Sequence, residues 1–288
     1  MITNMAGKNI LILGHSGFVG RALVRRLKET GDNLFLASKD GGGEQGDLKD
    51  KNFCERILKD IDIVYYLAGC KKNIAFHMAE PFYFFTENVL PLTTFLDALK
   101  NSKAKKIIYL SSIIINYINS EEKDGYILGK YANELMLKTF AAQFPQIETV
   151  VLRSAPIYGP GDNFDAKTAN FIPSMINKVA ASEKAVEVWG TGKRKMQFIY
   201  IEDLIDNLIA ASGASNGVYN IGNNEAAAVS EIAETIIKKF GKQLILEFNA
   251  TMPDKATNLA VFNNLSAPAY NLERGLDKTI KYFQENIL

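Results

Sequence analysis

The chain of 288 residues is poor in the residues from which metal and disulfide sites are built. It contains two histidines and two cysteines, Cys54 and Cys70, and no CxxC pair. Such a composition favours neither a metal centre nor a disulfide framework. We therefore expect a protein without a metal centre.

Neither sign of charge is in excess, and long apolar runs are missing. The 33 Lys and Arg residues nearly balance the 32 Asp and Glu residues, which leaves a formal net charge of +1. A chain without a basic excess is not expected to bind nucleic acid. No apolar run approaches the length of a membrane span, and the first residues lack the apolar stretch of a secretory leader. We expect a cytoplasmic protein that has no membrane partner.

The first motif that is present is a glycine-rich turn between a predicted strand and a predicted helix. Residues 10–13 are Ile-Leu-Ile-Leu, a run typical of a buried parallel strand, and Gly14, Gly17 and Gly20 follow at GxxGxxG spacing. An apolar stripe in residues 21–30 predicts the helix. Bare backbone can approach phosphate groups, and a helix N-terminus favours their charge. The motif therefore predicts a dinucleotide site; the alternative is a glycine-rich turn that binds no ligand.

The residues after the second predicted strand bear on the choice of cofactor. A free ribose 2′-hydroxyl is usually met by Asp or Glu at this place, whereas here Ser38 and Lys39 follow the strand. A hydroxyl and an ammonium suit a 2′-phosphate, so we expect NADP, with NAD less favoured. The alternative is a solvated turn in which Lys39 touches nothing. Asp47, in the next turn, could accept from an adenine amino group.

A serine pair and a YxxxK motif carry the predicted chemistry. Ser111 and Ser112 end a predicted strand, and Tyr126 and Lys130 lie one turn apart on a predicted helix, so their side chains share a face. An ammonium beside a phenol favours the phenolate, and a serine at the strand end can bind a carbonyl. This set suits proton transfer to oxygen while a nicotinamide moves a hydride. His77, a lone histidine, is expected at the surface.

Apolar periodicity predicts strands and helices that alternate along the chain, as in a parallel sheet with crossover helices. Strands are expected at residues 33–38, 62–69, 106–110, 148–153, 198–203, 219–222 and 243–248. Helices are expected at residues 50–59, 86–101 and 171–181, from Tyr126, after Ser230 as N-cap, and from about Leu272.

Together these motifs resemble the extended short-chain dehydrogenase/reductases that act on nucleotide sugars, and within them the GDP-L-fucose synthase branch. The resemblance covers almost the whole chain and rests on GHSGFVG, GDL, LAG, LSS, YxxxK, LRSAPIYGPGDNF, VWGTGK and FIYIEDL. It implies an α/β fold: a doubly wound parallel Rossmann sheet with a smaller C-terminal α/β substrate domain. The implied division is residues 1–155 for NADP and 156–288 for the nucleotide sugar, with 197–223 returning to the first domain.

The resemblance also implies roles for individual residues. The catalytic triad would be Ser112 (with Ser111 as the alternative), Tyr126 and Lys130. The substrate would meet Asn163, Lys178, Trp189 and Lys193. A homodimer would form through a four-helix bundle built from residues 86–101 and the Tyr126 helix. The residues that would meet the cofactor are Gly14, His15, Ser16, Gly17, Phe18, Val19, Gly20, Ser38, Lys39, Asp47, Leu48, Leu67, Ala68, Gly69, Ser111, Tyr126 and Lys130.

The chain departs from the fucose synthase pattern at the groups that epimerise carbon. Ile113 or Ile114 stands in place of a cysteine, and Asn170 in place of a histidine. Neither an isoleucine nor a neutral asparagine can exchange a proton near neutral pH. Two arginines expected at the diphosphate are replaced by Met196 and Asn258, and the segment between Ser112 and Tyr126 is short.

These observations predict an NADPH-dependent 4-ketoreductase of a nucleotide-activated 4-keto-6-deoxy sugar, with GDP as the favoured nucleotide and without epimerisation at C3 or C5. Two alternatives remain open. One is a 4-epimerase that holds NAD tightly, and the other is a protein that binds NADP without catalysis.

Overall fold

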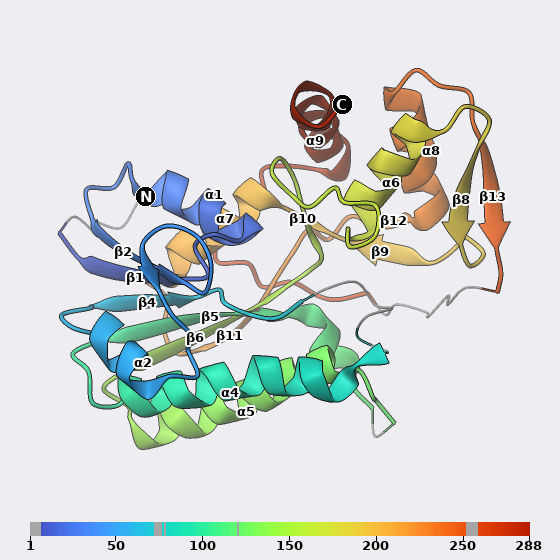
Figure 1. Ribbon diagram of the computed structural model, residues 1–288. Helices are drawn as coiled ribbons and strands as arrows, with labels where there is room; N and C mark the ends of the chain where they lie inside the picture. The colour runs from blue at the N-terminus through green and yellow to red at the C-terminus, as the bar shows by residue number, and fades with distance from the viewer. Residues whose placement is uncertain (1–6, 72–76, 78, 120, 252–258) are drawn as a thin grey trace. The chain divides into compact units, whose positions relative to one another are not determined.

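The computed structural model describes residues 7–71, 77, 79–119, 121–251 and 259–288. The chain divides into two compact units. The first unit contains residues up to Ser154, residues Ile205–Ile221 and residues Asn263–Ser266. The second contains Ala155–Leu204, Gly222–Phe262 and Ala267–Leu288. Each unit is a body with its own buried core, and Figure 1 shows its elements.

The first unit is built on a seven-stranded parallel sheet in the order β3-β2-β1-β4-β5-β6-β11. The strand bounds are β1 Asn9–Leu13, β2 Asn33–Ser38, β3 Glu44–Gln45, β4 Ile63–Tyr66, β5 Lys106–Ser112, β6 Glu148–Ser154 and β11 Gly217–Ile221. The chain goes outward from β1 to β3, returns, and continues on the other side from β4. The order therefore reverses between β1 and β4, which is where doubly wound sheets bind ligands. The predicted α/β fold with a doubly wound parallel sheet is confirmed.

Helices cover both faces of this sheet (Figure 1). On one face lie α2 (Lys51–Ile57), α4 (Pro81–Leu99) and α5 (Gly125–Gln143), over a core that includes Tyr66, Phe95 and Tyr109. On the other face lie α1 (Phe18–Leu27) and α7 (Ile201–Ala211), joined by a hydrogen bond from Arg26 to Asp206. Burial of these aromatic and aliphatic side chains is the main stabilising contribution to the unit.

Helices α4 and α5 approach each other at two glycines. A Cβ on Gly125 would lie 1.6 Å from the carbonyl oxygen of Pro81, and one on Gly129 would lie 3.1 Å from the Cβ of Asn88. No other residue would fit at position 125 without moving the backbone of α4. The two helices therefore pack at very short distance where α5 begins.

In the residues that the structure describes, the second unit contains three two-stranded sheets and three helices. The strand pairs are β7 (Ile157–Tyr158) with β10 (Ile199–Tyr200), β8 (Ala185–Trp189) with β13 (Ile245–Asn249), and β9 (Lys195–Gln197) with β12 (Ala226–Ala228). The helices are α6 (Phe171–Ala181), α8 (Val229–Lys239) and α9 (Leu272–Asn286). The smaller C-terminal α/β region that was predicted is confirmed.

In the first unit, a short 3₁₀ helix, η1 (Ile113–Tyr117), follows β5.

Several predicted element bounds were wrong. Helix α4 begins at Pro81, five positions before the predicted start, because a proline is readily accommodated at the first helical position. Ser230 does not cap α8: Ala228 is the N-cap residue, and its backbone N–H donates to Glu231 at 2.7 Å. The predicted strand at residues 62–69 ends at Tyr66, and no strand was predicted at residues 185–189, where β8 lies.

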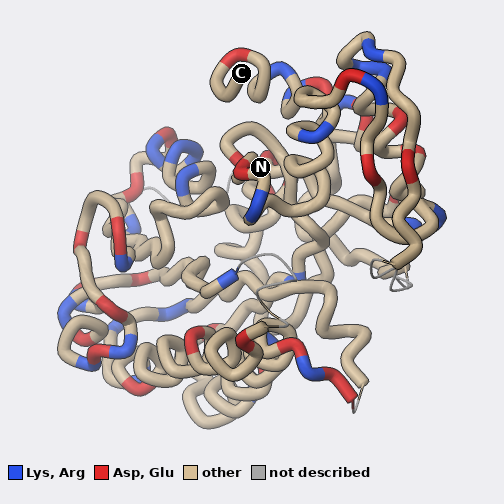
Figure 2. Tube along the Cα trace, turned by 45° about the vertical axis from the view of Figure 1, so that its right-hand side comes forward, with Lys and Arg blue, Asp and Glu red and all other residues tan. Residues whose placement is uncertain are grey.

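Residues of both charge signs are interspersed along both units (Figure 2). This distribution agrees with a formal net charge of +1. Within the residues that the structure describes, no helix combines the length and the apolar character that crossing a bilayer requires.

Candidate cofactor and catalytic site

The glycine-rich turn adopts a conformation that its sequence requires. Gly14 has φ of +79°, and a Cβ there would lie 2.9 Å from the backbone nitrogen of Ala68. Gly17 is the N-cap residue of α1 and supplies no side-chain cap, so the first N–H groups of the helix are open to an anion. A Cβ on Gly20 would lie 2.2 Å from the carbonyl oxygen of Gly14. The remaining predicted residues of this segment are His15, Ser16, Phe18 and Val19, which complete the turn and begin α1.

The segment after β4 lies between this turn and α5. Leu67 donates its N–H to the carbonyl oxygen of Leu13 at the end of β1, and the backbone of Ala68 lies against Gly14. On the other side, a Cβ built on Gly69 would lie 3.6 Å from the Nζ of Lys130. Residues 67–69 therefore connect the glycine-rich turn to the lysine of the YxxxK motif.

Asn88 of α4 holds the end of this segment in place, although no sequence motif points to this residue. Its buried side chain donates to the carbonyl oxygen of Cys70 at 2.9 Å and accepts from the N–H of the same residue at 3.1 Å. A side-chain amide that makes both backbone hydrogen bonds of one residue holds that stretch as a strand partner would. Only the fold brings Asn88 to Cys70, because eighteen positions separate them.

Tyr126 and Lys130 lie in the first two turns of α5. The Lys130 side chain is buried, donates from Nζ to the carbonyl oxygen of Leu110 at 2.9 Å, and lies 4.7 Å above the ring centre of Tyr109. Burial lowers the pKa of Lys130 to about 7; the charge of Lys71 acts in the same direction and that of Glu134 opposes it. Loss of hydration disfavours the ammonium form.

The pKa of Tyr126 lies above its ordinary value, because burial and the nearby Asp124 carboxylate both disfavour the phenolate. The pKa of Tyr126 is thus not lowered, contrary to what we expected from a neighbouring Lys130. The consequence is that Tyr126 is a neutral phenol at neutral pH, the form that can donate a proton.

The two serines at the end of β5 face opposite sides of the sheet, since successive strand residues alternate. Ser111 is on the same face as Tyr109, whose ring contacts Lys130. Among the described residues the buried Ser111 hydroxyl has no hydrogen-bond partner. The Ser112 hydroxyl instead accepts from the N–H of Ile114 at 3.4 Å, as the cap of η1. A buried hydroxyl lacking a partner within the described chain fits a site that is completed by a ligand.

The residues at the end of β2, which we expected to bind a phosphate, already have partners within the protein. The Ser38 hydroxyl donates to the carbonyl oxygen of Asp40 at 2.5 Å. The Nζ of Lys39 is 3.6 Å from a carboxylate oxygen of Asp47, and two thirds of the Lys39 side chain is exposed (67%). Asp47 thus offsets part of the charge of Lys39, while Leu48 packs against the core. An exposed pair of this kind is weak and can open for a ligand.

His77 was expected at the surface, and this was wrong. It is 5% exposed, and its ring stacks on that of Tyr126 at 5.0 Å between centres and 22° between planes. Its position depends on a residue 47 positions away, Asp124, so no local pattern could reveal it.

Of the residues expected to meet the sugar nucleotide, the structure brings two together. The Nζ of Lys178 lies 5.8 Å above the ring centre of Trp189 and 3.8 Å from the carboxylate of Glu187. Asn163 bonds within its own loop, to Thr168 at 2.8 Å, and Lys193 is exposed in the turn after β8. Within the described part of the second unit, no hydrogen bond joins Asn163 or Lys193 to the Lys178–Trp189 pair.

The positions that depart from the fucose synthase pattern carry no proton donor in the structure. Ile113 is buried and Ile114 is exposed, both in η1, and Asn170 is the N-cap residue of α6. Met196, in β9, accepts a contact from Arg194 at 3.4 Å. Asn258 lies outside the described residues.

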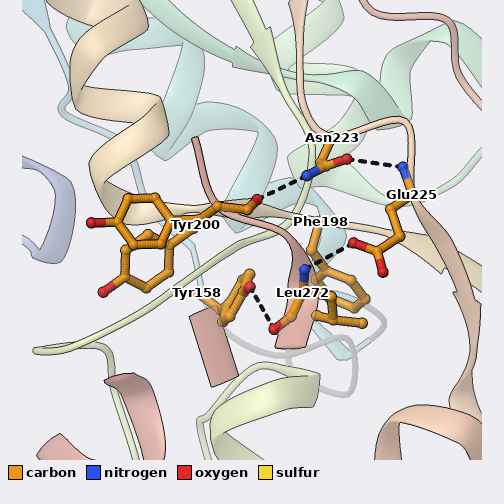
Figure 3. A pocket seen from close by; sticks show the side chains of 7 residues that line it. Tyr158, Phe198, Tyr200, Asn223, Glu225 and Leu272 are labelled. Carbon is orange, nitrogen blue, oxygen red and sulfur yellow. Dashed lines mark hydrogen bonds between the residues drawn. The ribbon is translucent and has the colours of Figure 1, made fainter. Parts of the chain in front are cut away.

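The YGP and FIYIED motifs meet in a small pocket of the second unit (Figure 3). Tyr158 donates to the carbonyl oxygen of Leu272 at 3.3 Å, Glu225 accepts from the N–H of Leu272 at 2.9 Å, and Asn223 donates to Tyr270 at 2.9 Å. These bonds hold the start of α9. Tyr158, Asn223 and Glu225 thus already bond the backbone around the pocket, so its role is in packing.

Comparison with known proteins gives the same assignment over most of the chain. Residues 10–222 match the model of the NAD dependent epimerase/dehydratase family. GDP-L-fucose synthase of Escherichia coli is 25% identical over an alignment of 320 positions, gaps included, which covers 98% of each chain. The dTDP-4-dehydro-6-deoxy-D-allose reductase of a Streptomyces species is 22% identical, covering 97% of each chain.

Among solved structures, a UDP-N-acetylglucosamine 4-epimerase from Methanobrevibacter ruminantium superposes with a TM-score of 0.86 at 23% identity. The match covers 98% of this chain and 100% of that one. At this identity the likeness shows the fold. Because the family model spans the glycine-rich turn, the serine pair and the YxxxK helix, the chain belongs to the NAD dependent epimerase/dehydratase family.

Proposed function

We propose that this protein is an NADPH-dependent 4-ketoreductase of a nucleotide-activated 4-keto-6-deoxy sugar, with GDP as the favoured nucleotide. The observation that carries the proposal is the continuous contact from Gly14 through residues 67–69 to Lys130. It sets a dinucleotide-type turn beside a buried lysine that lies one turn after Tyr126 on α5, and a cofactor site next to a phenol that can donate a proton is what a carbonyl reductase needs.

The residues of the first unit fit a dinucleotide. The diphosphate would meet the turn from Gly14 to Gly20, where the α1 N-terminus is open and close backbone approach leaves no room for side chains. Ser38 and Lys39 would meet the 2′-phosphate, with Asp47 and Leu48 beside the adenine. When bound, NADPH supplies a hydride.

The chain's own residues would handle the proton. Tyr126 donates to the alkoxide oxygen that forms at C4, and Lys130 supplies positive charge beside the phenol. We favour Ser111 as the serine that orients the carbonyl, because its buried hydroxyl lies on the same face of β5 as Tyr109 and has no hydrogen-bond partner among the described residues. Asn163, Lys178, Trp189 and Lys193 are proposed contacts of the nucleotide sugar.

Reduction without epimerisation is the finer part of the proposal. Inverting a carbon beside a ketone requires a base on one face and an acid on the other. Ile113, Ile114 and Asn170 can be neither. The GDP assignment is supported by the motifs shared with the fucose synthase branch, one member of which is 25% identical along the whole chain.

We also propose a homodimer through α4 and α5. These helices expose a set of large apolar side chains, each 42–48% accessible, which are Tyr83, Leu90, Tyr131 and Leu135. Exposed apolar groups on adjacent helices suit a four-helix interface between two copies.

The test is a panel of GDP-, CDP-, dTDP- and UDP-4-keto-6-deoxy sugars, with NADPH oxidation and product formation measured together. Stoichiometric NADPH consumption on one of them supports a reductase. The second candidate, a 4-epimerase with tightly held NAD, is favoured by the pairing of Lys39 with Asp47. It predicts no turnover of the 4-keto sugars, interconversion of the corresponding 4-hydroxy nucleotide sugars without net NADPH consumption, and NAD released on denaturation. Cofactor binding without turnover of any sugar would leave a non-catalytic binding protein.

A further inference from the structure

His77 lies between two aromatic rings inside the first unit. One face of its imidazole stacks on Tyr126, with 5.0 Å between ring centres and 22° between planes. Phe84 of α4 also contacts it, at 4.6 Å and 58°. With 5% of its surface exposed, the imidazole is part of the wall that surrounds the Tyr126 ring.

Asp124 connects this imidazole to the helix that carries Tyr126. One carboxylate oxygen accepts from the N–H groups of Tyr126, at 2.9 Å, and Ile127, at 3.3 Å, which caps α5. The other oxygen lies 3.3 Å from the Nδ1 of His77. Burial raises the pKa of Asp124, but the hydrogen bond and charge of His77 and the two backbone N–H groups outweigh this, so the pKa lies below its ordinary value. An ionised carboxylate can only accept, so Nδ1 is the donor.

We propose that His77 is a positioning residue for the phenol of Tyr126. One carboxylate sets both the start of the helix that carries the tyrosine and the orientation of the ring that stacks on it. This proposal rests on the proposed function, in which Tyr126 donates the proton. A buried ring against one face of the phenol restricts its rotation, and proton transfer requires the hydroxyl to be held within hydrogen-bond reach of the reacting oxygen.

Three variants distinguish the effect of the stacked ring at position 77 from the effect of its contact with Asp124. His77→Ala removes the ring, and we expect kcat to fall about 10- to 100-fold, since small misplacements of a reacting group have effects of this size. His77→Phe keeps a stacking ring and should retain kcat within about threefold, the margin below which positioning is unaffected. Asp124→Ser keeps an N-cap residue of similar strength but loses the contact to Nδ1, and kcat should fall between the two. KM for NADPH should change little in all three.

A second readout does not depend on activity. With tyrosines labelled at Cζ with ¹³C, the NMR signal of Tyr126 is assigned by its loss in Tyr126→Phe. In His77→Ala this signal should shift or split, whereas in His77→Phe it should stay near its wild-type position. Phe140→Leu, a buried substitution farther along α5, serves as the control: it should lower Tm and leave the Tyr126 signal and kcat unchanged.

The outcomes are distinct for the two proposals. An unchanged Tyr126 signal in His77→Ala, or equal losses of kcat in His77→Ala and His77→Phe, would overturn the positioning role. A displaced signal in a protein that turns over no nucleotide sugar would uphold the positioning role and reject the proposed function. If His77→Ala does not fold, His77→Phe and Asp124→Ser still decide the question: a Tyr126 signal that is kept in the first and displaced in the second supports the proposal, and one unchanged in both rejects it.

Discussion

Arg153 of β6 donates three hydrogen bonds to the carboxylate of Glu134 on α5, at 2.7 to 3.2 Å. Glu134 is 8% exposed and lies one turn after Lys130. Arg153 also donates to Asn116 in η1, at 2.6 Å. This pair therefore ties the catalytic helix to the sheet and to the segment that follows the two serines.

We expect Glu134→Gln to destabilise the protein by about 3 kcal/mol, because it leaves a mostly buried guanidinium without its counter-charge. The measurement is urea unfolding. Asp60→Asn, which removes the exposed pair with Lys103, is the control and should leave the midpoint unchanged. Equal midpoints for wild type and Glu134→Gln would mean that Arg153 finds other partners.

Stability should rise with pH between about 7 and about 10, and Lys130 is the reason. Its pKa is about 7 in the folded protein against an ordinary value of 10.5. In this window the unfolded chain keeps the proton that the folded protein has released, so the free energy of unfolding increases with pH. Below pH 7 Lys130 is protonated in the folded and the unfolded protein. The full cost of burying its charge then lowers the free energy of unfolding, and this cost no longer changes with pH. Unfolding measured at pH 7 and pH 9 should show a smaller rise in Lys130→Met than in the wild type, and an equal rise would refute the assignment.

Tyr126→Phe should lower kcat by at least about 100-fold, the lower range for a general acid, while NADPH binding survives. Lys130→Ala should reduce both turnover and cofactor affinity, because the Lys130 side chain lies against Gly69 and, in its protonated form, supplies positive charge to the site. Steady-state kinetics and cofactor titration measure the two effects separately.

Ser111→Ala and Ser112→Ala form a matched pair for the same mechanism. We expect the larger loss of kcat in Ser111→Ala, since its hydroxyl shares a face with the Tyr109–Lys130 contact. Near-wild-type turnover of Tyr126→Phe, or a larger loss in Ser112→Ala, would contradict the corresponding assignment.

NADPH should bind about 10- to 100-fold more tightly than NADH, the range expected for charge-assisted contacts to a phosphate. Ser38→Asp should shrink or reverse this ratio. Fluorescence titration with both cofactors measures it, and Lys184→Gln in the second unit, which changes the net charge by the same amount as Ser38→Asp, is the control. Equal affinities in the wild type would favour the pairing of Lys39 with Asp47 over a phosphate site.

The product formed in D₂O should carry no deuterium at C3 or C5 beyond the rate of exchange without enzyme. The hydrogen at C4 comes from NADPH, and Ile113, Ile114 and Asn170 cannot exchange protons at the neighbouring carbons. NMR of the product decides this. Enzyme-dependent deuterium at either carbon would reject the reductase-only assignment, and His77 and Lys71 would be the first residues to substitute.

Much of the fold followed from local patterns. The Ile10–Leu13 run, the glycine spacing and the 171–181 periodicity each predict their element because burial and backbone freedom act within a few residues. The site could be predicted less completely from the sequence. Strand alternation separates Ser111 from Ser112, but which face meets α5 depends on tertiary packing. Asn88 and His77 act through Cys70 and Asp124, contacts that exist only once the chain has folded.

The glycines at which α4 and α5 contact each other also determine where the side chains of Tyr126 and Lys130 point. Gly125 and Gly129 each precede a residue of the motif, Tyr126 and Lys130, so one stripe of α5 meets backbone while the adjacent stripe presents the phenol and the ammonium. A helix that turned about its axis by one position, 100°, would move both groups out of register together. Two residues without a side chain, Gly125 and Gly129, thus fix the rotation of α5 about its axis and the direction in which the Tyr126 side chain points.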